Sequence, residues 1–180
     1  LLLLAAVPVA FLLLYTLSSN VQARVGAFWR DIDNFWASPY GQIFRVAFGI
    51  WKRNPLTGSG MKNFQLACER AALPGLHDAC YPHAHNIYLE WLSESGLVGF
   101  TCFVIFVGLL AWRVLRLTWT HPGQRLTGTA LCGSLIVTLF PVAATQSFFS
   151  NWPAMVVWTA LGVMAGVTRV AQQTAADKAA

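Results

Sequence analysis

Charged side chains are scarce in this sequence, since Asp, Glu, Lys and Arg together make up 11% of its 180 residues. Hydrophobic residues make up 56%, and the mean hydropathy is +0.54. A soluble globular domain of this length carries more charge and less apolar surface. The composition therefore indicates a membrane protein.

Blocks of like charge are also missing, although the formal net charge is +5. A basic arm that binds nucleic acid is therefore not expected. Clusters of metal ligands with the spacing of a zinc site are missing too. The pair His83-x-His85, with His77 and Asp78 nearby, is a weak metal signal by itself. We expect neither a metal nor another cofactor.

Four apolar segments reach or approach the ~20 residues of helix that cross a bilayer. They are residues 1–17, 97–117, 126–145 and 152–170. The sequence thus predicts an all-α, polytopic transmembrane helix bundle with about four spans. Because the chain opens at Leu1 inside an apolar run, we expect it to be the C-terminal part of a longer protein. A signal peptide ending near Val21-Gln22-Ala23 is the alternative for the first segment, but three later spans favour a transmembrane helix.

Basic residues near the ends of the short links predict the orientation, because cytoplasmic links are enriched in Lys and Arg. These residues are Arg113, Arg116, Arg125, Arg169 and Lys178. Residues 18–96 then form a large extracytoplasmic loop with short helices, residues 97–170 form three transmembrane helices, and residues 171–180 form a cytoplasmic tail.

The four cysteines fall into two groups. Cys102 and Cys132 lie in apolar runs and are most simply small buried residues. Cys68 and Cys80 lie in the polar segment. An extracytoplasmic segment permits disulfides, so these two are candidates for a bond.

Residues 42–53 are predicted to form an amphipathic helix. Apolar Phe44, Ala47, Phe48 and Trp51 recur at i, i+3, i+4 and i+7, which is helical spacing. The opposite face carries Arg45, Gly49, Lys52 and Arg53, and Asn54-Pro55 ends the helix. Two interpretations remain open. The helix lies on the membrane with its basic residues on lipid phosphates, or one arginine is directed at a bound phosphate.

A second polar motif, His83-Ala84-His85-Asn86, stands directly before an apolar helix that carries Glu90 and Glu94. Its simplest interpretation is a polar helix cap. The alternative is catalytic, because a neutral imidazole accepts a proton from a hydroxyl group, and nearby guanidinium groups stabilise a departing pyrophosphate. Glu94 is then either a surface carboxylate or a group that orients a histidine or arginine.

Together these motifs resemble the O-antigen ligase and O-antigen polymerase superfamily. The pattern His85-Asn86-x-Tyr88-Leu89, followed by Glu94-x-Gly96-Leu97-x-Gly99, is similar to that family's large external loop. Upstream, Arg45 and the stretch Asn54-Pro55-Leu56-Thr57-Gly58-Ser59-Gly60 with Phe64 resemble its arginine helix and Pro-x-x-Gly-x-Gly turn. The resemblance covers about residues 42–99.

The resemblance implies a multi-pass glycosyltransferase of the bacterial inner membrane that needs no metal. Such an enzyme moves a glycan from undecaprenyl pyrophosphate to an acceptor hydroxyl on the periplasmic face. The implied activity is O-antigen ligation to lipid A-core, a step of lipopolysaccharide biosynthesis. Membrane lipids are expected partners, and nucleic acid is not.

The resemblance also implies roles for single residues. His85 is the expected catalytic base or orienting group, and Arg45 is expected to hold the pyrophosphate, with Lys52 or Arg53 assisting. His83, Asn86 and Glu94 are expected to support them. The alternatives are a polysaccharide polymerase, a protein O-oligosaccharyltransferase and, outside the enzymes, a membrane transport component.

Overall fold

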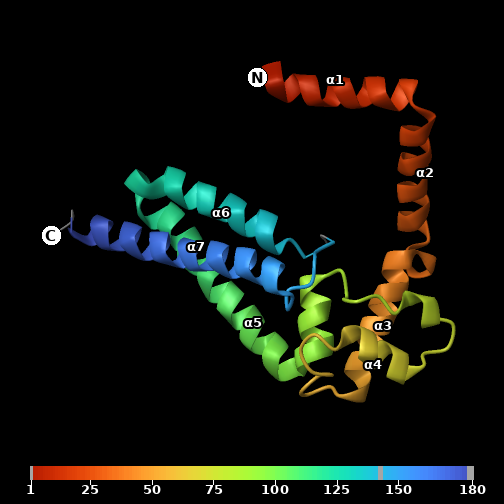
Figure 1. Cartoon of the computed structure of the whole chain (residues 1–180). Coiled ribbons are helices and arrows are strands. Elements are labelled where there is room, and N and C mark those ends of the chain that lie inside the picture. The colour runs from red at the N-terminus through yellow and green to blue at the C-terminus, as the bar shows by residue number, and fades with distance from the viewer. Residues whose placement is uncertain (1, 142–143, 178–180) are drawn as a thin grey trace. The chain divides into compact units, whose positions relative to one another are not determined.

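The computed structural model of the protein describes residues 2–141 and 144–177, and all regular structure in these ranges is helical. In chain order the helices are α1 (Leu2–Leu17), α2 (Ser19–Asp33), η1 (Phe35–Ala37), α3 (Pro39–Arg53), α4 (Phe64–Ala71), η2 (His77–Ala79), α5 (Ile87–Thr120), η3 (Pro122–Gln124), α6 (Arg125–Leu139) and α7 (Asn151–Asp177), where η denotes a 3₁₀-helix (Figure 1). The predicted all-α class is confirmed.

The chain divides after Gln42 into two units, and the first contains α1 and α2. The chain bends by 103° between these helices, which Figure 1 shows as a sharp turn. Ser18 lies at the turn and its side chain accepts a hydrogen bond from the Val21 N–H, as serine commonly does before a helix. Helix α2 was not predicted as a separate element, and Val21-Gln22-Ala23 lies inside it.

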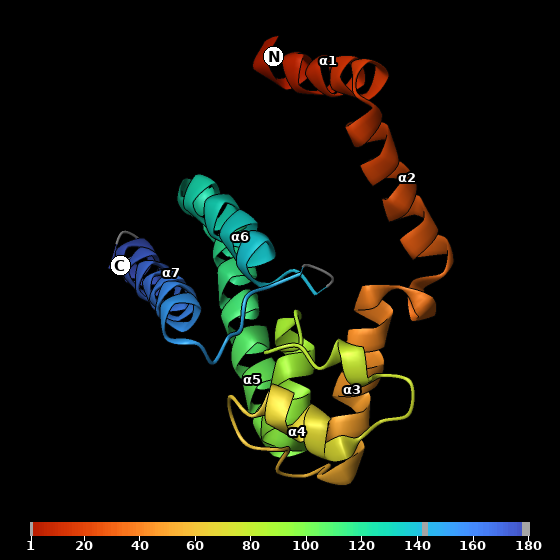
Figure 2. The same cartoon turned by 45° about the vertical axis from the view of Figure 1, so that its right-hand side comes forward.

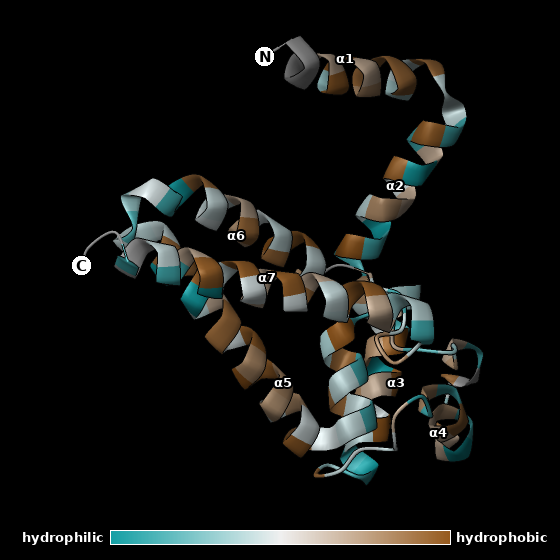
Figure 3. Cartoon of the chain, turned by 60° about the vertical axis from the view of Figure 1, so that its left-hand side comes forward, coloured by the Kyte–Doolittle hydropathy of each residue, from teal (hydrophilic) through white to brown (hydrophobic). Residues whose placement is uncertain are grey.

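In the second unit, α5, α6 and α7 pack into an apolar bundle. Figure 3 shows their apolar surfaces, including those of the long α5 and α7. The bundle core consists of buried residues at helical spacing: Phe103, Leu110, Val114 and Leu117 of α5, Leu131, Leu135 and Leu139 of α6, and Leu161, Met164 and Ala171 of α7. Such spacing gives each helix one buried stripe.

Two helices of the described chain, α5 and α7, are long and apolar enough to cross a membrane, and the bent pair α1 and α2 raises the number to three if it forms one span. The expected count of about four is not confirmed. The expected span 126–145 is wrong at its C-terminal end, because α6 stops at Leu139 after 15 residues. Phe140 is extended (φ −63°, ψ 122°), since a residue before a proline avoids the helical region.

A second buried cluster joins α3 and α4 to the start of α5, which Figure 2 shows side by side. The predicted helix 42–53 is present as α3, and it ends at Arg53 as expected. Its buried stripe is Ile43, Val46, Ala47 and Ile50. The predicted apolar face coincides with this stripe only in part, because Ala47 is buried, Phe44 and Trp51 are half-buried and Phe48 is 36% exposed.

A disulfide bond and a break in α5 shape this region. Cys68 of α4 is bonded to Cys80, with a Cα–Cα distance of 5.5 Å. Helix α5 breaks at Gly96, whose φ of 65° and ψ of −170° are not helical. The break separates a first arm, residues 87–95, from a long apolar arm, residues 97–120. The long arm begins where the sequence predicted a span to begin.

Candidate functional site

Asn86 fixes the point at which α5 begins. Its side-chain oxygen accepts hydrogen bonds from the N–H groups of Tyr88 and Leu89, both at 3.1 Å. A helix cap was the simpler of the two interpretations of the His83–Asn86 motif. The amide nitrogen of Asn86 donates to the Pro141 carbonyl at 2.6 Å. Asn86 therefore ties the link after α6 to the start of α5.

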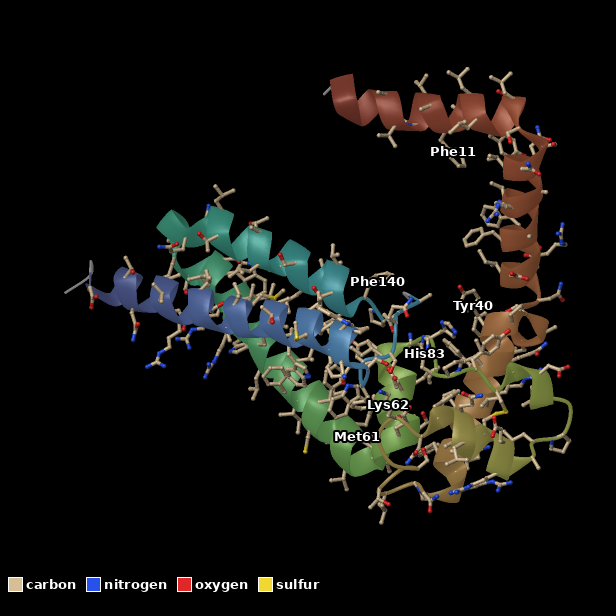
Figure 4. The ribbon with its side chains drawn as sticks, in the orientation of Figure 1. Phe11, Tyr40, Met61, Lys62, His83 and Phe140 are labelled. Carbon is tan, nitrogen blue, oxygen red and sulfur yellow. A yellow bond between two sulfur atoms is a disulfide. The ribbon has the colours of Figure 1, made fainter. Side chains whose placement is uncertain are left out.

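His85 directly precedes this cap and has a left-handed backbone, with φ of 51°. Few non-glycine residues adopt this conformation, and it is held here by a hydrogen bond from the Thr145 N–H to the His85 carbonyl at 2.9 Å. The His85 ring lies 4.1 Å from the His83 ring and 5.6 Å from the Tyr81 ring, centroid to centroid. Figure 4 shows His83 beside the start of α5.

Burial lowers the pKa of His83 below its ordinary value of 6.5, and the neighbouring His85 lowers this pKa further. A hydrogen bond with the Thr145 backbone opposes both effects in part. The buried Nε2 of His83 has no hydrogen-bond partner within the described ranges. The two larger effects favour the neutral form of the His83 imidazole, whose ring packs against that of His85. Among the described side chains, no group of three His, Cys, Asp or Glu is placed to hold a metal; the His77 side chain lies outside them.

Glu90 is a site residue whose role the sequence analysis missed. It is 1% exposed, and its two carboxylate oxygens accept hydrogen bonds from the Ser147 hydroxyl at 2.5 Å and the Phe148 N–H at 2.6 Å. We call these two contacts the Glu90 clasp. In addition, the Tyr88 hydroxyl donates to the Leu139 carbonyl at 2.8 Å. A carboxylate within an apolar run was the available signal, because a buried charge needs partners.

Glu94 matches neither of its two predicted interpretations, because it is buried and its described partner is a backbone N–H rather than a histidine or arginine. It is 1% exposed, and its carboxylate accepts a hydrogen bond from the Lys62 N–H, just before α4. Figure 4 shows Met61 and Lys62 beside the first arm of α5. Glu94 therefore secures the turn that leads into α4, and the surface interpretation was wrong.

The glycine turn after α3 docks into the break of α5 through backbone hydrogen bonds. The N–H groups of Ser59 and Gly60 donate to the carbonyls of Ser93 and Glu94, at 3.0 and 2.9 Å. In the other direction, the N–H groups of Leu97 and Val98 donate to the carbonyls of Pro55 and Leu56, at 2.9 and 3.2 Å. The two motifs that carry the family resemblance are thus two halves of one junction.

Gly58 and Gly96 lie at the centre of this junction, with φ of 70° and 65°. A Cβ atom on Gly58 would lie 2.4 Å from the Glu94 carbonyl, and one on Gly96 would lie 2.4 Å from the Leu56 carbonyl. Only glycine meets both the conformation and the spacing. The motif glycines therefore serve close backbone approach, which the sequence analysis did not predict.

The predicted basic residues do not gather around His85 in the described contacts. Arg45 and Lys52 are exposed and lie on one face of α3, because they are seven residues apart. Arg53 donates to the carbonyls of Arg70, at 3.4 Å, and Ala71. It thereby caps the C-terminus of α4, where a cation is favourable.

Two cavities adjoin the motifs. One of about 420 Å³ is mostly apolar, and its lining includes Ile87, Thr145 and Trp152. The other, of about 190 Å³, is lined by polar and basic side chains that include Arg53 and Arg70. The first lies directly beside the His85 backbone, because Thr145 bonds to it.

Comparison with protein families identifies the family to which these motifs belong. A model described as O-antigen ligase matches residues 1–104. The chain belongs to the O-antigen ligase family. No curated protein and no solved structure matches it.

The O-antigen ligase match runs from α1 through the junction into the long arm of α5, so it contains every motif residue from Arg45 to Gly99. Membership of this family implies glycosyltransferase-type activity of the O-antigen ligase and polymerase kind. It also implies that the partners of the protein are a lipid-linked glycan and an acceptor. Together with the apolar helices it identifies a multi-pass membrane protein. The predicted family is therefore confirmed.

Proposed function

We propose that this protein transfers a glycan from undecaprenyl pyrophosphate to an acceptor hydroxyl of lipid A-core, at the periplasmic face of the bacterial inner membrane. The observation that carries the proposal is the His83-Ala84-His85-Asn86 segment, which is held by a helix cap and by Thr145 within a chain of the O-antigen ligase family. Catalytic side chains need such fixed support, because small displacements of a reacting group cost much of the rate.

In the proposed reaction, the acceptor oxygen attacks the anomeric carbon of the donor glycan while the His85 imidazole takes the hydroxyl proton. The bond between that carbon and the pyrophosphate oxygen breaks, and its electron pair leaves with undecaprenyl pyrophosphate. Because this is a single displacement, the configuration at the anomeric carbon inverts. The reaction as written needs no metal or other cofactor.

In this proposal, basic residues of α3 neutralise the negative charge of the leaving pyrophosphate. Arg45 and Lys52 are exposed, so both are accessible to an anion. Arg45 is the stronger candidate, because a guanidinium binds phosphate oxygens in a bidentate manner. Arg53 is the weakest of the three, since it already donates to carbonyls of α4.

The apolar cavity of about 420 Å³ beside Thr145 supports a lipid-borne donor. Its lining includes Trp152, Pro153 and Val156 at the start of α7. A polyprenyl chain is a plain hydrocarbon and binds to such a surface by burial of apolar area. The lipid end of the donor would then lie against α7 with its pyrophosphate near the histidines.

The decisive experiment is complementation of a strain that lacks the enzyme, using the complete protein with His85→Ala. We expect glycan transfer onto lipid A-core to fall by about 10²–10⁴-fold, the usual contribution of a general base. His121→Ala, at the other end of α5, is the matched control and should retain activity. Unchanged transfer in His85→Ala would remove the role assigned to His85.

The same strain separates a ligase from a polymerase. Loss of a ligase leaves long lipid-linked polymer that is not attached to lipid A-core. Loss of a polymerase leaves single repeat units on the carrier instead. We expect the long polymer to accumulate, and accumulation of single units would favour the polymerase.

A further inference from the structure

A cavity of about 540 Å³ lies at the end of the bundle where α5 and α7 both finish. It is lined by Trp112, Arg113 and Arg116 of α5 and by Arg169 and Gln172 of α7. None of these five lining residues is acidic. Three guanidinium groups from two helices therefore face one space without a carboxylate among them.

We infer that this cavity binds the phosphate headgroup of an anionic membrane phospholipid. The site does not depend on the proposed transfer reaction, and it is formed by a different part of the chain. Arginine is suited to the task because its planar fork of N–H donors matches the oxygens of a phosphodiester. Basic pockets between helices at the cytoplasmic membrane surface have the chemistry that anionic headgroups require.

The geometry of the two helices brings the basic side chains together. Arg113 and Arg116 are three residues apart on α5, and Arg169 and Gln172 are three apart on α7, so each pair lies on one helix face. Beneath them, Val114, Leu117 and Ala171 are buried in the bundle core. Helix packing thus fixes the backbones on either side of the cavity.

The ordinary explanation for arginines near helix ends does not apply. A cation stabilises the last turn of a helix through the helix dipole, but the last turns of α5 and α7 carry no basic residue. A preference for positive charge on cytoplasmic links accounts for the sign of the charge. It does not require that three arginines from two helices line one cavity.

A lipid is favoured over a soluble phosphate because an apolar surface continues from the cavity along both helices. Phe106 lies two turns before Arg113 on the same face of α5, and Trp158 lies three turns before Arg169 on the same face of α7. Their rings meet across the two helices, 5.9 Å apart. Figure 3 shows these apolar stretches leading into more hydrophilic surface at the end of the bundle. Acyl chains would lie along this surface while the headgroup occupies the cavity.

The test measures lipid binding to the purified full chain in detergent by native mass spectrometry. Phosphatidylglycerol is the anionic probe, phosphatidylethanolamine is the zwitterionic control, and glycerol phosphate is the soluble headgroup without chains. We expect phosphatidylglycerol to bind at least ~10-fold more tightly than phosphatidylethanolamine, since the ammonium group of the latter cancels the net charge of its headgroup and is repelled by the three guanidinium groups. Glycerol phosphate at the same concentration should not displace the lipid.

Single substitutions locate the site. Arg113→Gln and, independently, Arg169→Gln should each weaken phosphatidylglycerol binding by roughly tenfold. Arg125→Gln, which removes an arginine outside the cavity, should leave binding unchanged. Equal binding of the two lipids, or unchanged binding in both cavity variants, would overturn the inference. Displacement by glycerol phosphate would instead identify a site for a soluble phosphate.

Discussion

At the scale of single residues, glycines carry much of the architecture around the candidate site. Gly58 and Gly96 let two segments pass with their backbones in contact, and they adopt positive φ angles. Their place in the family pattern is therefore explained by the fold rather than by direct contact with substrate. The histidine segment leads directly into the first arm of α5, so its position depends on this junction.

Gly96→Ala is expected to destabilise the protein strongly. The φ and ψ of Gly96 lie in a region open essentially to glycine, so the substitution costs about 1–3 kcal/mol in backbone strain alone. The added Cβ would also meet the Leu56 carbonyl at 2.4 Å. The measurement is the thermal unfolding midpoint of the purified protein. Gly108→Ala is the control in the same helix, because a Cβ there meets open space; an equal effect of both variants would contradict the role given to the junction.

Features that depend on residues adjacent in the chain were predicted, whereas a contact between distant residues was not. The Asn86 cap and the end of α3 at Arg53 were predicted, because each depends on residues adjacent in the chain. The capping of α4 by Arg53 was not predicted, because its partners lie 17 and 18 residues away. No pattern of spacing along the chain reveals such a tertiary contact.

At the scale of helices and links, the Glu90 clasp connects the two parts of the site. Through Ser147 and Phe148 it holds the link that also supplies the Thr145 N–H to the His85 carbonyl. The first arm of α5 and this link therefore form one hydrogen-bonded assembly. The partners in the clasp are 57 and 58 residues apart in sequence, so periodicity gave no indication of it.

Glu90→Leu is expected to loosen the link with little change in the size of the side chain. A leucine side chain has no acceptor, so the Ser147 hydroxyl and the Phe148 N–H both lose their partner in the clasp. Each unpaired buried group costs about 1–3 kcal/mol. Hydrogen exchange of the Phe148 amide should accelerate by one to two orders of magnitude. Glu69→Leu, on the exposed side of α4, is the control, and equally fast exchange in both variants would refute the clasp.

The helices themselves were predicted with uneven success, for identifiable reasons. The existence of α3, α5, α6 and α7 followed from apolar periodicity and run length. The buried face of α3 followed only in part, because Ala47 of the predicted face is buried but aromatic Phe48 is exposed, while Val46 outside that face is buried. The early end of α6 was readable from Pro141, but the apolar run across it hid the boundary.

At the scale of the whole molecule, the long arm of α5 separates two kinds of chemistry. Residues 97–120 extend about 36 Å as a helix, which matches the ~30 Å hydrocarbon core of a bilayer with a margin. The His83–Asn86 segment precedes this arm and the arginine-lined cavity adjoins its end. If the arm spans the membrane, the proposed transfer site and the proposed lipid site lie at opposite surfaces.

The orientation is testable with cysteines placed on the two sides, in a background where Cys102 and Cys132 are replaced by serine. Thr57→Cys reports on the glycine turn and Gly123→Cys on the link between α5 and α6, and both positions are exposed. Positive charge on that link predicts that it is cytoplasmic. A membrane-impermeant maleimide should therefore label Thr57→Cys in intact spheroplasts and Gly123→Cys only after lysis.

The same orientation exposes Cys68 and Cys80 to an oxidising compartment, so mass spectrometry of the unreduced protein should find them linked. Labelling in the reverse order, together with two free thiols, would place the histidine segment in the cytoplasm, where a periplasmic acceptor cannot reach it.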